Sequence, residues 1–189
     1  MHAALVIVLV GLLLGGCGGG DTRATPPESA TVAAGTLPRL DTGRDITAID
    51  GRFTLRIPIG WVAANDPVAE LAFREESALS IRRFNIAREQ LGSIGEPLAY
   101  AEAARERIRS QLADVLTLSL DVVKVGDRSG ARWVYTARVE QETFLFYQFF
   151  LIDAGEGFVF TGVAPSTNSV EETRRYYDVI VGSFAFGRG

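Results

Sequence analysis

The stretch from Leu116 to Pro165 constrains the fold of this chain more than any other part of its sequence. Long segments rich in apolar and β-branched residues alternate there with short polar turns, and the segments cover residues 118–125, 132–139, 143–153 and 158–163. Turns this short join antiparallel neighbours, because a parallel crossover needs a dozen residues or more. The sequence therefore predicts an antiparallel meander in the second half of the chain.

One of these segments, Phe144–Ile152, is apolar at both odd and even positions. A strand with one solvated face would alternate apolar and polar residues, so this strand is expected to be covered on both faces. Two helical segments are available to cover it. The first begins at Gly95-Glu96-Pro97, and its apolar residues recur at helical spacing; they are Leu98, Ala101, Ala104, Ile108, Leu112 and Val115. The second begins near Ser169, where Glu172 completes a capping-box pattern, and it ends at Gly182-Ser183.

The first half of the folded part carries further strand patterns. Phe53–Ile57 alternates apolar and polar residues, and Pro58-Ile59-Gly60-Trp61 predicts a turn directly after it. Segments 70–74 and 78–86 predict a hairpin around Glu75-Glu76-Ser77. The order of strands, helix, strands and helix predicts an α+β domain, with an antiparallel β-sheet of about six or seven strands and a helix packed on each face.

A resemblance to a known family rests on four of these features. They are the strand running into Pro58-Ile59-Gly60-Trp61, the mid-chain helix, the meander of long strands and the last helix ending in Gly182-Ser183-Phe184. Together they resemble the PsbP/DcrB-like fold over about residues 46–186. The resemblance implies an α/β/α sandwich that is often exported and lipid-anchored, with accessory or unassigned roles. That family has no shared catalytic set, so the resemblance implies no active-site residue.

The amino-terminal segment predicts export. Residues 3–16 carry no charge, and the apolar run is shorter than the ~20 residues that a helix needs to span a bilayer. Leu14-Gly15-Gly16-Cys17 resembles the lipobox of bacterial lipoproteins, which implies cleavage before Cys17 and attachment of diacylglycerol to its sulfur. Two or three acyl chains hold a protein durably at a membrane. The alternatives are a buried structural cysteine behind a simple cleavable signal, or an uncleaved apolar anchor.

These features divide the chain into three parts. Residues 1–16 are predicted to be a lipoprotein signal peptide, and residues 46–189 the PsbP-like α/β domain. Between them, residues 17–45 are rich in Gly, Thr and Pro and are predicted to be a disordered tether. A flexible chain of that length has a root-mean-square reach of roughly 30 Å.

The residue inventory excludes several kinds of function. His2 is the only histidine and Cys17 the only cysteine. The domain therefore lacks a cysteine nucleophile, a Ser–His pair, a His or Cys zinc site and a disulfide. The net charge of −4 argues against a nucleic-acid partner, which requires a basic face. We expect no catalytic, cofactor-binding or metal-binding residue, and a domain that is monomeric.

Several side chains could have a functional role, but the sequence favours a structural or solvent-exposed role for each. Trp61 could stack on a ligand, and six phenylalanines could line a lipid pocket, but core packing is favoured for all of them; the six are Phe144, Phe146, Phe149, Phe150, Phe158 and Phe160. The acidic residues lack the spacing of a calcium loop or of a catalytic pair and are expected to be solvated; they are Asp41, Asp45, Asp50, Glu75, Glu76, Glu140 and Glu142. Two basic pairs, Arg82-Arg83 and Arg174-Arg175, are expected to be surface charge, with the first pair divided between opposite faces of a strand.

These observations predict a non-catalytic protein of the cell envelope, anchored through lipid on Cys17 and binding an envelope partner or serving an accessory role. If the organism has an outer membrane, the protein is expected there, facing the periplasm; otherwise it is expected on the outer leaflet of the plasma membrane. The alternative is a carrier of an apolar small ligand or lipid, held between the sheet and one helix.

Overall fold

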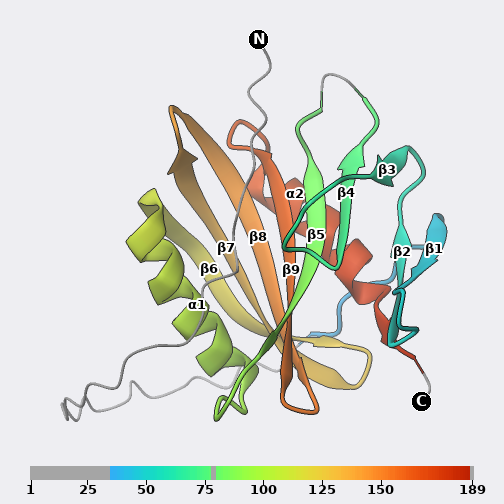
Figure 1. Ribbon diagram of the computed structural model, residues 1–189. Coiled ribbons are helices and arrows are strands. Elements are labelled where there is room, and N and C mark those ends of the chain that lie inside the picture. Colours follow the sequence, from blue (N-terminus) through green and yellow to red (C-terminus); the bar gives the residue numbers. More distant parts are fainter. Residues whose placement is uncertain (1–34, 78–79, 188–189) are drawn as a thin grey trace.

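The computed structural model describes residues 35–77 and 80–187. Within them, two helices and two antiparallel sheets form a layered domain (Figure 1). The α+β class and the helix on each face of the main sheet are as the sequence predicts. The larger sheet has seven strands in the order β3-β4-β5-β9-β8-β7-β6. Their bounds are β3 Trp61–Ala63, β4 Leu71–Glu75, β5 Arg83–Gln90, β6 Ala113–Val125, β7 Arg128–Val139, β8 Glu142–Asp153 and β9 Glu156–Pro165.

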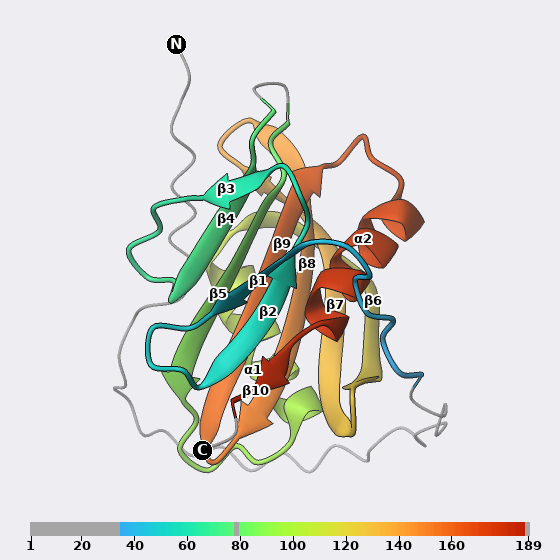
Figure 2. The ribbon, with the colours of Figure 1, turned by 90° about the vertical axis from the view of Figure 1, so that its right-hand side faces the viewer.

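A helix covers each face of this sheet, and a small second sheet shares one of the faces. Helix α1, Pro97–Gln111, packs against β6, β7 and β8. On the other face lies α2, Val170–Gly182, beside a three-stranded sheet in the order β1-β2-β10 (Figure 2). The small sheet consists of β1 Arg44–Thr47, β2 Phe53–Ile57 and β10 Ala185–Phe186. The sequence predicts the two helices but not the separate small sheet.

The central strand β8 is buried on both faces, as the apolar residues at its odd and even positions predict. Phe146 and Phe150 face α1, whereas Phe149 and Leu151 face α2 and the small sheet. β8 lies between β7 and β9, so its backbone is paired along both edges. The side chains on the two faces of β8 therefore belong to two apolar layers, one on each side of the sheet.

Helix α1 begins where the sequence predicts and ends earlier. Pro97 occupies its first turn, where a missing N–H removes no helical hydrogen bond. Ala101, Ala104 and Ile108 are buried against the sheet, but Leu98 is 38% exposed. The predicted apolar stripe also includes Leu112 and Val115, which lie beyond the helix because it ends at Gln111. Both side chains still pack against the α1-side core, so burial alone does not distinguish helix from strand at this boundary.

Helix α2 confirms its predicted cap. The Ser169 hydroxyl accepts a hydrogen bond from the Glu172 backbone N–H at 3.4 Å. Glu171 and Glu172 lie in the first turn, where negative charge is favourable beside the helix dipole. The helix ends at Gly182, and a Cβ added there would collide with the backbone carbonyl of Pro38. Glycine therefore lets the end of α2 pack against the segment that precedes β1.

Several strand boundaries differ from the sequence prediction. β5 begins at Arg83, whereas the sequence predicts a strand from residue 78, and residues 78 and 79 lie outside the described residues. Trp61 begins the short strand β3 instead of only closing a turn, because its backbone pairs with Glu75. β6 and β7 each extend beyond the predicted segments, to Ala113 and Arg128 respectively. In each case pairing with a neighbouring strand sets the boundary, and a local pattern cannot record that pairing.

The predicted tether overlaps the folded part of the structure. Residues 17–34 lie outside the described residues, but residues 35–45 pack against the domain. Leu37 is 7% exposed and belongs to the α2-side core, and β1 begins at Arg44. Leu37 is a single apolar residue between Thr36 and Pro38. The composition of this stretch therefore does not indicate that one of its residues belongs to the core. Among the described residues, no helix is long and apolar enough to cross a bilayer.

Candidate functional site

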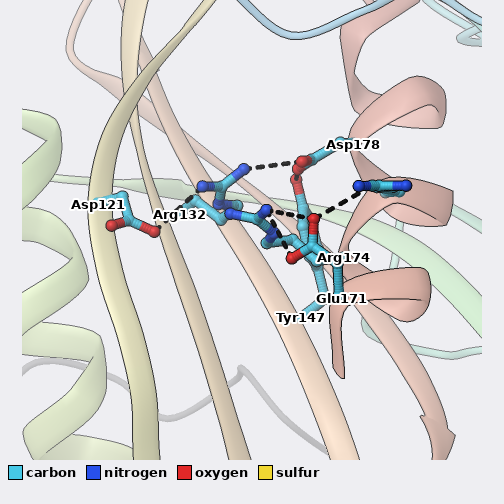
Figure 3. A network of polar contacts seen from close by, with 7 residues as sticks. Asp121, Arg132, Tyr147, Glu171, Arg174 and Asp178 are labelled. Carbon is cyan, nitrogen blue, oxygen red and sulfur yellow. Dashed lines mark hydrogen bonds and ion pairs between the residues drawn. The ribbon is translucent and has the colours of Figure 1, made fainter. Parts of the chain in front are cut away.

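The most concentrated polar cluster lies between α2 and the sheet, centred on the buried Arg132 of β7 (Figure 3). Arg132 Nη1 donates to Asp178 Oδ2 at 2.7 Å, and Nη2 donates to Asp121 Oδ2 at 3.1 Å. Tyr147 Oη donates to the other oxygen of Asp178, Oδ1, at 2.8 Å. Arg132, Asp178 and Tyr147 are all less than 8% exposed, whereas the Asp121 side chain is 42% exposed. The cluster therefore joins three strands to α2 through one buried carboxylate.

A second set of charges on α2 flanks this cluster toward solvent. Glu171 binds Arg174 at 2.6 Å and Arg175 at 3.1 Å, both within the same helix (Figure 3). The hydrogen bond from Arg174 holds the pKa of the Glu171 carboxyl below its usual value. The predicted surface pair Arg174-Arg175 is thus present on the surface, but both members are engaged by one glutamate.

The buried cluster is suited to holding the fold and poorly suited to acid–base chemistry. Burial, together with the neighbouring Asp178 charge, raises the pKa of the Tyr147 phenol well above its usual value. That phenol stays protonated and donates its hydrogen to Asp178 at neutral pH. Asp178 is in turn paired with a guanidinium that remains charged. The arrangement offers no exposed nucleophile, and we assign it the role of fixing α2 on the sheet.

Sequence reasoning missed this cluster, although a signal for it exists. Arg132 stands within the segment Ala131–Tyr135, whose other members are apolar. A charged side chain in a strand buried on both faces needs a partner of opposite charge. Asp178 stands beside the buried Tyr177 in α2 and meets that need. Because 46 residues separate the two partners, a local sequence pattern does not predict their pairing.

Trp61 is a core residue, as predicted. It is 4% exposed, its indole N–H donates to Tyr176 Oη at 2.7 Å, and the two rings stack with centroids 6.1 Å apart. The Arg82 guanidinium lies 4.8 Å from the centroid of the Tyr176 ring. Arg82 is therefore a partner of an aromatic side chain rather than an isolated surface charge. Since β5 begins at Arg83, Arg82 also lies just before the strand on which it was predicted.

The six phenylalanines of β8 and β9 form two core layers, as predicted. Each is at most 4% exposed. Phe144, Phe146 and Phe150 lie on the α1 side, and Phe149, Phe158 and Phe160 lie on the α2 side. On the α1 side, Tyr135 stacks on Phe146 at 5.0 Å and on Trp133 at 3.8 Å. The prediction of core packing is confirmed for all six.

The acidic residues of the predicted linker belong to the folded domain. Asp45 lies on β1 and binds Arg56 at 2.7 Å, and Asp50 binds Arg88 at 2.9 Å. The hydrogen bond from Arg56 lowers the pKa of Asp45, and a backbone hydrogen bond from Arg52 lowers that of Asp50. Their side chains are exposed as predicted, but the two are held in ion pairs, and β1 replaces the expected linker around Asp45.

The glutamate pairs lie at chain reversals, as predicted. Glu75 ends β4 and accepts a hydrogen bond from the Ser80 hydroxyl, and the exposed Glu76 follows it. Glu140 lies in the turn before β8, which begins at Glu142. Within residues 35–77 and 80–187, no group of three or more His, Cys, Asp and Glu side chains could hold a metal ion. Cys17, the predicted lipidation site, lies outside the described residues.

Comparison with known proteins identifies the fold and no close relative. No family model matches the sequence, and no curated protein matches it. Among solved structures, LpqN of Mycobacterium tuberculosis, described as involved in cell envelope biogenesis, aligns with a TM-score of 0.57 at 11% identity. The alignment covers 77% of this chain and 90% of LpqN.

Cyanobacterial PsbP from Synechocystis aligns with a TM-score of 0.54 at 10% identity, covering 85% of this chain and 98% of PsbP. The yeast Ran-binding protein Mog1p aligns with a TM-score of 0.53 at 10% identity, covering 76% and 95% of the two chains. A Bacteroides thetaiotaomicron protein also aligns, at 15% identity and a TM-score of 0.53, but this chain spans about half of it, 49%. The domain has a PsbP-like α+β fold.

Proposed function

We propose that this protein is a lipid-anchored envelope protein whose domain has a non-catalytic binding or accessory role. The observation that carries the proposal is the position of Cys17. It follows Leu14-Gly15-Gly16 directly, and 17 residues lie between it and the packed segment that begins at Gly35. Lipid at this cysteine would hold the domain near a membrane without a spanning helix.

Two further observations support the non-catalytic part of the proposal. The domain contains neither histidine nor cysteine, and its buried charges are paired within the cluster around Arg132. Proteins with the same fold include LpqN, described as involved in cell envelope biogenesis, and the Ran-binding protein Mog1p. A fold used for binding and accessory roles in other proteins supports the same kind of role here, with the partner left to experiment.

Mass spectrometry of the full chain, purified from bacterial membranes, tests the anchor. We expect the mature protein to begin at Cys17 and its first peptide to carry a diacylglycerol thioether. A Cys17→Ser variant is the control and should be neither acylated nor cleaved at this position. A free thiol at Cys17, or a mature chain that still begins at Met1, would contradict the proposal.

One observation favours the second candidate, a carrier of an apolar ligand with a polar group. On the α1 side of the sheet, Tyr135 Oη and Gln148 Oε1 are buried, and neither has a hydrogen-bond partner among the described residues. A buried polar atom without a partner is costly, and a bound molecule or water can supply one. Native mass spectrometry of the delipidated full chain distinguishes the two. A stoichiometric apolar adduct supports the carrier, and a bare protein mass supports the binding module.

A further inference from the structure

A row of polar side chains crosses the α1-side face of the large sheet. By register, Gln148 of β8 lies opposite Thr161 of β9, and Thr161 lies opposite Asn85 of β5. Gln148 Nε2 donates to Thr161 Oγ1 at 3.3 Å, and Asn85 Nδ2 donates to Asp66 Oδ2 at 2.9 Å. Asp66 belongs to the loop between β3 and β4, which passes in front of β5 in Figure 1. The row points to the α1 side because the residues that follow or precede its members belong to the α2-side core; they are Phe149, Phe160 and Phe84.

Two polar atoms at the buried end of this row have no hydrogen-bond partner among the described residues. They are Gln148 Oε1 and Tyr135 Oη, on side chains of residues that are 1% and 0% exposed. The residue of β7 opposite Gln148 is Trp133, so Tyr135 is the diagonal neighbour of Gln148 on the same face. Diagonal neighbours in an antiparallel pair lie about 7–8 Å apart, within reach of long side chains. One polar group between the two side chains can therefore serve both atoms.

Helix α1 covers only part of this face. It packs against β6, β7 and β8, whereas β4 and β5 carry the solvent-exposed side chains Arg74 and Arg83 on the same face. Arg83 lies opposite Val163 of β9. Val163 lies opposite Phe146 of β8, which in turn lies opposite Tyr135 of β7. These neighbours lead from solvent at β5 to the buried phenol, and they give a ligand its route of entry.

The chemistry of the two side chains selects the ligand. Burial raises the pKa of the Tyr135 phenol, so the phenol is neutral and keeps its hydrogen. The phenol can donate a hydrogen bond, and the Gln148 carbonyl can accept one. A matching ligand group therefore carries an acceptor and a donor, as an alcohol and an amide do. A carboxylate supplies acceptors alone, and it would bring a charge into an apolar environment.

We propose that Tyr135 and Gln148 bind the polar end of an apolar molecule that carries an uncharged hydroxyl or amide group. Tyr135 stacks on Trp133 at 3.8 Å and on Phe146 at 5.0 Å, so aromatic rings border the site and favour an apolar ligand body. The inference deepens the carrier candidate of the proposed function, and it does not depend on lipid at Cys17.

Calorimetric titration of the full chain tests the ligand class. In a Cys17→Ser background, which carries no lipid, the probes are 1-decanol, decanamide and decanoate at a pH of about 8, each below its solubility limit. We expect saturable binding of the alcohol and the amide, with dissociation constants at least tenfold lower than that of decanoate. Absence of saturable binding of the alcohol and the amide would overturn the proposal. Equal or tighter binding of decanoate would overturn it as well.

Two substitutions locate the site. Tyr135→Phe removes the phenol oxygen and Gln148→Leu removes the amide, and each should weaken the binding of 1-decanol at least fivefold. The matched control is Tyr147→Phe, whose phenol lies on the α2 side and donates to Asp178. Its dissociation constant should stay within twofold of that of the unsubstituted chain. If both site variants bind as tightly as the unsubstituted chain, the site is wrong, although an apolar adduct in native mass spectrometry would still support a carrier.

The stability of the ligand-free chain provides a second readout. Because Tyr135 Oη has no partner, Tyr135→Phe should leave the urea midpoint unchanged or raise it. Tyr147→Phe should lower the midpoint, because it removes a buried hydrogen bond. A lower midpoint for Tyr135→Phe would mean that the phenol is bonded within the chain, and this result would overturn the proposal.

Discussion

Replacing Asp178 with asparagine should destabilise the domain strongly, because that carboxylate serves two buried donors. Arg132 Nη1 and Tyr147 Oη each bind a different oxygen of Asp178, at 2.7 and 2.8 Å. An asparagine side chain has one acceptor oxygen, so one of the two donors faces an amide N–H instead. Arg132 and Asp178 are 6% and 7% exposed, so solvent does little to compensate the loss.

The magnitude follows from the contacts that remain. Removing one partner of a buried ion pair costs about 3–5 kcal/mol. Arg132 keeps Asp121 at 3.1 Å, so we expect Asp178→Asn to lower the free energy of unfolding by about 3–4 kcal/mol. With an m-value of about 2 kcal/mol/M, the urea midpoint falls by about 1.5–2 M. Fluorescence of the buried Trp61 and Trp133 reports the transition.

A matched variant separates the loss of a partner from the loss of the cluster itself. Arg132→Met, Asp178→Leu and Tyr147→Phe together remove all three buried polar partners and leave Asp121 to the solvent. Replacing a buried ion pair by apolar residues is often neutral, so the triple variant should unfold within about 1 kcal/mol of the unsubstituted chain. A loss below about 1 kcal/mol for Asp178→Asn alone would refute the reasoning, as would a triple variant as unstable as the single one.

Two further predictions concern a close packing contact and a surface ion pair. Gly162→Ala should lower stability by about 1–3 kcal/mol in urea unfolding, because its Cβ would lie 2.7 Å from atoms of the Tyr177 ring; Gly95→Ala, with open space around it, should change stability little. The Asp45 carboxyl should titrate in NMR below its ordinary pKa of about 3.9, and Arg56→Gln should return it toward that value. Since folding lowers this pKa, the pair stabilises the fold above about pH 4 and this contribution is lost on acidification; an unchanged Asp45 titration in Arg56→Gln would refute the assignment.

The sequence by itself determined the elements whose signals are local. Ser169 and Glu172 mark the start of α2, and Pro97 marks the start of α1, because helix ends depend on residues within one turn. The apolar residues at both odd and even positions of β8 determined that it is covered on both faces. The inventory of histidine and cysteine determined which chemistry the domain lacks, and the segment ending in Cys17 supplied the envelope hypothesis.

The tertiary structure alone decided the contacts between distant parts of the chain. β2 pairs with β10 across more than 120 residues, and Arg132 meets Asp178 across 46. Leu37 joins the core from a segment whose composition predicts a tether. These contacts depend on which strands and helices become neighbours in space. Partners that lie far apart in the sequence produce no periodic pattern within a short window, so the sequence alone does not reveal them. Local signals therefore fix where the two helices begin, while burial and pairing between distant segments fix the strand boundaries and the tertiary contacts.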